Sequence, residues 1–162
     1  MLSAQNGATV SAMPVVSYAA LSERPPLVGV SCAKDSFTLK VAFQSKSFSL
    51  CLLGKEHVDA FTRLASAKGS RDADKLAEAG LRHRNGRKLD VPVIIGSAAA
   101  IECSLIKSLT LGDHVFLVGK IERASASPDF RGYWRFASYH PMLYAGWREG
   151  MNLYRNPSRR TR

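Results

Sequence analysis

A cation and two hydroxyl groups alternate along one short polar segment of the chain, at Lys34, Ser36 and Thr38. The segment follows an apolar, β-branched run and precedes a stretch with a helical pattern, so the three side chains stand at a predicted helix amino terminus. Unpaired backbone N–H groups and the helix dipole favour an anion there. The pattern fits a phosphate site, but hydroxyls at this position also serve as helix caps, and the residues alone favour capping.

A rigid turn leads into this segment. Pro25 and Pro26 fix φ and remove two backbone donors, so the chain is extended before a predicted strand at Leu27–Cys32. Further short apolar runs, each bounded by Gly, Pro, Ser or Asp, predict more strands. They lie near Ala12–Ala19 and at Phe48–Leu53, Ala98–Leu105 and Val115–Ile121.

Three helices are predicted between these strands, at Thr38–Gln44, Glu56–Ala65 and Asp72–Ala79. The second places Val58, Phe61 and Ala65 on one face at three- and four-residue spacing. The third begins at Asp72, a good N-cap residue, and ends at Gly80. Residues 81–90 are predicted to be a polar connection that returns the chain to the strands.

Many short strands with a few helices predict a mainly β fold with some α structure, an antiparallel β-barrel whose closure removes reactive edges. The pattern lacks long alternating βαβ units and a Gly-x-Gly-x-x-Gly fingerprint, which argues against a doubly wound nucleotide-binding sheet. A chain of 162 residues fits one domain. We predict that it spans residues 1–150 and is followed by a flexible basic tail at 151–162.

The formal net charge of +10 raises nucleic-acid binding by a basic OB-type barrel as an alternative. Much of the excess lies in the polar connection and in the tail. The aromatic and basic residues do not interleave as they do in single-strand binders, so we predict no specific nucleic-acid partner.

The sequence has no apolar segment long enough to span a membrane and no secretory leader. We therefore predict a cytoplasmic protein with no membrane partner. Cys32, Cys51 and Cys103 are odd in number and lie inside strand-like segments, as expected of buried thiols in a reducing compartment. The histidines and cysteines have no metal-ligand spacing, so no metal site is predicted.

Four motifs carry a resemblance to a known family. Met13 precedes Ser22-x-x-Pro25-Pro26, and Lys34-x-Ser36-x-Thr38 follows in register. Further on come Gly69-x-x-x-x-Asp74-Lys75-Leu76 and a strand pair in which Ile101-Glu102-Cys103 is followed by Gly112-Asp113-His114. In this order the motifs resemble those of the flavin reductase-like family, the FMN-binding split barrels, and the resemblance covers residues 1–147.

The resemblance implies a Greek-key antiparallel split barrel that forms a homodimer and holds FMN at the subunit boundary. It implies that the FMN phosphate is bound by Lys34, Ser36 and Thr38. The flavin ring would lie along the backbone of Val16 and Ser17, with further backbone contacts from Ser31, Cys32 and Ala33. The family often has Ser-Trp where this chain has Val16-Ser17, so ring stacking by that Trp is not available.

His114 is implied to lie near the flavin and the incoming nicotinamide, where it would orient them, with Asp113 holding its ring. On general grounds a single His at a strand start is more often a structural donor. Six aromatic residues near the carboxyl end favour packing or a dimer contact. They are Tyr133, Trp134, Tyr139, Tyr144, Trp147 and Tyr154.

The implied function is hydride transfer from NAD(P)H to flavin, with FMN as cofactor and NAD(P)H as co-substrate. The electrons would pass to an oxygenase partner or to a ferric acceptor. The alternative is an FMN-binding module without reductase activity, which would serve as an electron relay or a flavin store.

Overall fold

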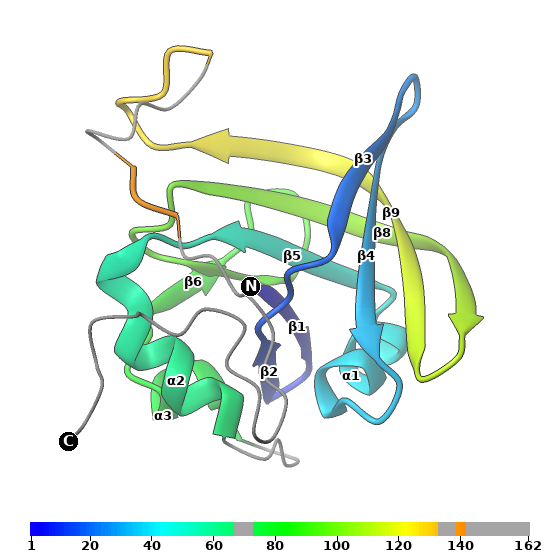
Figure 1. The fold of residues 1–162 in the computed structure, drawn as a ribbon, viewed down its shortest axis with the longest axis horizontal. Helices are drawn as coiled ribbons and strands as arrows, with labels where there is room; N and C mark the ends of the chain where they lie inside the picture. The colour runs from blue at the N-terminus through cyan, green and yellow to red at the C-terminus, as the bar shows by residue number, and fades with distance from the viewer. Residues whose placement is uncertain (67–72, 133–138, 142–162) are drawn as a thin grey trace, which may run out of the picture.

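The computed structural model describes residues 1–66, 73–132 and 139–141. Within them, seven strands form one antiparallel sheet in the order β2-β1-β5-β8-β9-β4-β3, which curls around the core (Figure 1). The strands of this sheet are β1 (Leu2–Asn6), β2 (Thr9–Met13), β3 (Tyr18–Glu23), β4 (Pro26–Ala33), β5 (Ser47–Leu52), β8 (Ala99–Leu111) and β9 (His114–Ala126).

A second, two-stranded sheet is formed by β6 (His83–Asn85) and β7 (Pro92–Ile94). The hydroxyl of Ser49 on β5 donates to the Pro92 carbonyl and ties the small sheet to the large one. The prediction of a plain polar connection at residues 81–90 is therefore wrong in part, because β6 lies within it.

The described helices are short: α1 (Phe37–Ser45), the 3-10 turn η1 (Lys55–His57), α2 (Val58–Ser66) and α3 (Lys75–Glu78). Helix α1 packs on β1 and β2, whereas α2 and α3 lie together on another side of the sheet (Figure 1). The predicted mainly β, antiparallel fold with a few short helices is confirmed.

The single strand predicted near Ala12–Ala19 is instead two strands, because β2 ends at Met13 and β3 begins at Tyr18. Pro14 follows Met13 and has no N–H to donate to a neighbouring strand, so the ladder stops there. Strand β3 forms one edge of the sheet, and its register against β4 shifts between Ala20 and Ser22.

The core consists of two groups of buried apolar residues. One lies between the large sheet and α1, and includes Leu39 and Phe48. The other lies beneath α2 and α3 and includes Leu64 and Leu76. All three cysteines are buried and free, as predicted.

The cap of α3 differs from the prediction. The helix begins at Lys75, and the side chain of Asp74 accepts hydrogen bonds from the N–H groups of Leu76 and Ala77. Asp72, the predicted cap, lies outside the described residues. Gly80 ends this segment at φ 78°, the left-handed conformation that glycine adopts without a Cβ clash.

Candidate functional site

The loop between β4 and α1 carries the residues predicted to hold a phosphate. Its backbone is fixed by the Lys34 N–H, which donates to the Asp113 carbonyl at 2.9 Å. Ser36 is the N-cap residue of α1, but within the described chain its side chain makes no capping bond and donates to Met13 Sδ at 3.0 Å. The first turn of α1 holds no acidic residue, so its N–H groups remain suited to an external anion.

Thr38 is turned the other way. It is 1% exposed, and its Oγ1 lies 2.8 Å from the hydroxyl of Ser11 on β2. This placement differs from the expectation that the Thr38 hydroxyl faces a phosphate, because the hydroxyl packs inside the protein. Only its backbone N–H stays at the helix terminus, as part of the first turn.

His114 lies beside this loop. It begins β9 and pairs with Ala33, the last residue of β4. Its Nδ1 is 2.8 Å from Asp113 Oδ1, and its side chain is 46% exposed. The hydrogen bond with His114 lowers the pKa of the Asp113 carboxyl. Asp113 thus holds the ring at Nδ1, and Nε2 lies on the far side of the ring from that carboxylate.

An apolar cavity of about 520 Å³ lies between the segment before β3, the end of β5 and α2. This volume is within the range of small-molecule sites. Much of its wall is aliphatic or aromatic: Val15, Val16, Leu52, Leu53, Val58 and Phe61.

The segment 13–17 joins the loop to the cavity. At one end Met13 accepts the Ser36 hydroxyl, and further on Val16 lines the cavity and is 54% exposed. The Ser17 carbonyl accepts the N–H of Ser31 at 2.8 Å, which holds the segment against β4. The structure therefore brings together the two backbone stretches predicted to contact the flavin ring, 16–17 and 31–33.

The Cys32 side chain points into the core, where it is 1% exposed, and burial raises the pKa of its thiol to about 12. Ser31 is half-buried and Ala33 is exposed. The Cys32 side chain is therefore not available to a ligand.

Helix α2 and the described stretch 139–141 provide one wall of the cavity. The sequence did not predict this wall. The three-residue spacing of Val58 and Phe61 signalled an apolar face, but in the structure Ala60 and Leu64 of α2 face the core. Tyr139 also lines the cavity. The other five residues of the predicted aromatic cluster lie outside the described residues.

Within the described residues, no group of three His, Cys, Asp or Glu side chains is placed to hold a metal ion. None of the helices in that part of the chain has the length and apolarity to cross a membrane.

The sequence profile of the flavin reductase like domain matches residues 1–148. This chain belongs to the flavin reductase-like family. The reductase subunit HsaB of a flavin-dependent monooxygenase from Rhodococcus jostii is 30% identical over 144 residues, 85% of this chain and 70% of that protein. The reductase component of the flavin-dependent trigonelline monooxygenase of Acinetobacter baylyi is 31% identical over 77% of this chain.

Among solved structures, an FMN-binding protein from Thermus thermophilus with bound 1-cyclohex-2-enone matches with a TM-score of 0.69 and 29% identity. The match covers 77% of this chain and 67% of that one. The split-barrel prediction is confirmed by this likeness. The chain spans about half the length of several curated relatives that it matches, and 38% of the Acinetobacter protein.

Proposed function

We propose that this chain is a flavin reductase that binds FMN and transfers hydride from NAD(P)H to flavin. The observation that carries the proposal is the uncapped amino end of α1, joined to an apolar cavity by the segment 13–17. The family, and relatives named as reductase components of flavin-dependent monooxygenases, support it.

The residues present fit a flavin mononucleotide at both of its ends. The Lys34 ammonium, the Ser36 hydroxyl and the first-turn N–H groups of α1, including that of Thr38, would hold the phosphate dianion. Backbone groups of Val16 and Ser17 would serve the polar edge of the ring, and the apolar cavity its faces. When bound, FMN supplies the hydride-accepting ring nitrogen that no side chain offers.

Backbone groups of Ser31, Cys32 and Ala33 would complete the ring contacts from β4. His114 would orient the incoming nicotinamide, with its own ring held by Asp113. The contribution of the protein is positioning, because holding donor and acceptor in contact makes an encounter into an oriented reaction.

We also propose a homodimer that holds the flavin at the subunit boundary. Exposed apolar side chains on the large sheet support it, since a surface of this kind favours association. They are Tyr18 and Leu21 of β3, and Ile106, Leu109 and Leu111 of β8. Reduced flavin would pass to an oxygenase partner or a ferric acceptor. Buried free thiols support a cytoplasmic location.

The alternative is an FMN-binding module without reductase activity. It is supported by the Thermus thermophilus relative, which is described only as an FMN-binding protein. The two candidates differ in one measurable property, the acceleration of flavin reduction by a nicotinamide.

The purified chain should bind FMN, as followed by absorbance and by quenching of flavin fluorescence. Under anaerobic conditions, NADH or NADPH should then bleach the flavin faster than it does without protein. Binding without faster bleaching would favour the module, and no binding of FMN or FAD would refute both.

The binding residues are tested with Lys34→Gln combined with Ser36→Ala, which should weaken FMN binding at least tenfold while riboflavin, which lacks the phosphate, is unaffected. Lys40→Gln is the matched control, because Lys40 is exposed on α1 beyond its first cap residues. Equal losses in both variants would mean general charge attraction and would refute the phosphate assignment.

A further inference from the structure

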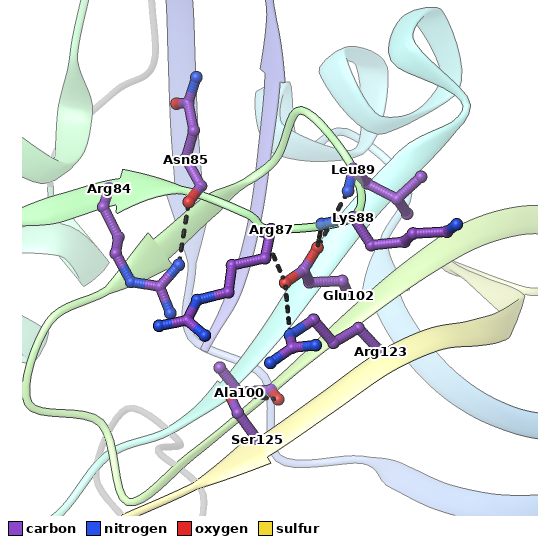
Figure 2. A network of polar contacts seen from close by, with 9 residues as sticks. All are labelled: Arg84, Asn85, Arg87, Lys88, Leu89, Ala100, Glu102, Arg123 and Ser125. Atoms are coloured by element: carbon purple, nitrogen blue, oxygen red, sulfur yellow. Dashed lines mark hydrogen bonds and ion pairs between the residues drawn. The ribbon is translucent and has the colours of Figure 1, made fainter.

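A second cavity, of about 510 Å³, lies between the turn after β7 and the paired ends of β8 and β9. Three arginines from separate segments line it: Arg84 of β6, Arg87 of the following loop and Arg123 of β9. Figure 2 shows their side chains directed into the same region, near Ala100 and Ser125.

The lining is cationic, and only Arg123 has an ion-pair partner, Glu102, among the described residues. Among the described residues, no aspartate or glutamate lines this cavity. The nearest carboxylate in Figure 2 is that of Glu102, which is 3% exposed. It already accepts the N–H groups of Arg87, Lys88 and Leu89 at 3.0, 2.7 and 3.0 Å.

The guanidinium groups retain free donors. Within the described part of the chain, the Arg87 side chain makes no hydrogen bond or ion pair, and Arg84 donates only to the Asn85 carbonyl at 3.0 Å. The Nε of Arg123 is 3.9 Å from Glu102 Oε1, beyond hydrogen-bond distance. Each guanidinium has five N–H donors in a planar fork that suits phosphate oxygens.

Apart from the arginines and three serines, Ser97, Ser125 and Ser127, the wall is apolar. Val93 and Ile94 of β7 and Ala100 of β8 line the cavity and are buried. Apolar surface beside clustered guanidinium groups suits a ligand with an organic body and a multiply charged phosphate end. We infer that this cavity binds a phosphate-bearing small molecule of the nucleotide class, with its phosphates on Arg84, Arg87 and Arg123.

This site shares no lining residue with the apolar cavity of the proposed flavin site, although Cys51 of that cavity pairs with Ala100 of this one. Arg123 lies about 30 Å from His114 as measured along β9. Figure 1 shows β9 running from the turn after β8, near the β4–α1 loop, to the opposite side of the molecule. The inference therefore holds whether or not the chain is a flavin reductase.

The test is isothermal titration calorimetry of the full chain with ADP, pyrophosphate and adenosine, at one fixed ionic strength, with and without saturating FMN. ADP and pyrophosphate should bind, adenosine should bind far more weakly, and FMN should leave ADP binding unchanged. Arg84→Gln combined with Arg87→Gln should weaken ADP binding at least tenfold.

Arg82→Gln is the matched control, since Arg82 is exposed in the same segment and does not line the cavity. It should change ADP affinity less than twofold. Should the double variant fail to fold, Arg87→Gln alone decides, because that side chain makes no hydrogen bond or ion pair with the described residues. It should weaken ADP binding at least threefold.

Three outcomes would overturn the inference. The first is that neither ADP nor pyrophosphate binds at about 1 mM, which is weaker than a specific site requires. The second is that Arg82→Gln weakens ADP as much as the cavity variants do, which indicates general surface attraction. The third is that FMN displaces ADP, which places the nucleotide in the flavin site.

Discussion

The buried carboxylate of Glu102 anchors the loop after β6, and replacing it tests how much that anchor stabilises the fold. In Glu102→Gln, three N–H groups lose a charged acceptor, and the amide NH₂ meets at least one of them. A hydrogen bond to a charged group contributes about 1 kcal/mol more than a neutral one. We therefore expect the free energy of unfolding to fall by about 3 kcal/mol at neutral pH.

The pH dependence of this loss has a definite sign. Burial raises the pKa of Glu102, but the N–H groups of Leu89, Arg87 and Lys88, together with the Arg123 cation, outweigh it and lower the pKa below its ordinary value. The stabilisation is therefore fully present above the ordinary carboxyl pKa and is lost as the pH falls through the lower, folded-state pKa. The difference between wild type and variant should shrink in acid.

Urea denaturation of both proteins at neutral pH and in acid measures this difference, and other carboxyl groups cancel in the comparison. Glu122→Gln on β9 is the control, because it removes the same charge where the carboxylate accepts from Ser104 and Lys120 side chains and not from a loop backbone. A loss at Glu102 under about 1 kcal/mol, or one equal at both pH values, would refute the reasoning.

Substitutions at three further positions test the packing and the cap of α3, each by urea denaturation. Thr38→Val leaves the buried Ser11 hydroxyl without its partner and should cost about 1–3 kcal/mol; an unchanged midpoint would contradict the buried pair. Gly119→Ala puts a Cβ 2.5 Å from Phe48 Cζ, so overpacking should cost about 1–3 kcal/mol, and a neutral result would mean that the ring moves freely. Asp74→Ala removes the cap of α3 and should cost about 1 kcal/mol, whereas Asp74→Asn should retain most of the stability.

The strands were predictable where apolar runs meet turn residues, but their lengths were not. The predicted strand Ala98–Leu105 continues to Leu111, because the chain stays paired with β9 after burial ends. Lys107 and Ser108 lie in this exposed half, where no burial pattern marks a strand. Backbone pairing with a neighbour, and not the local sequence, sets such an end.

The sequence was enough to predict the loop of the candidate site, but not the positions of the residues around that loop. The helix start after Lys34 could be predicted from local residue types, but the position of His114 beside Ala33 depends on how β4 pairs with β9. The inward rotation of Thr38 depends on a partner 27 residues away in the chain, Ser11. Contacts between residues far apart in the chain cannot be predicted from the local pattern of a single sequence.

The register shift in β3 bears on how copies of this protein would meet in the proposed homodimer. An open strand edge offers a ladder of amides to any other extended chain, which is the usual route to aggregation. The irregularity between Ala20 and Ser22 interrupts that ladder in mid-strand. In the proposed homodimer, recognition at this margin would therefore work through side chains such as Tyr18 and Leu21, whose shapes select a partner as backbone amides do not.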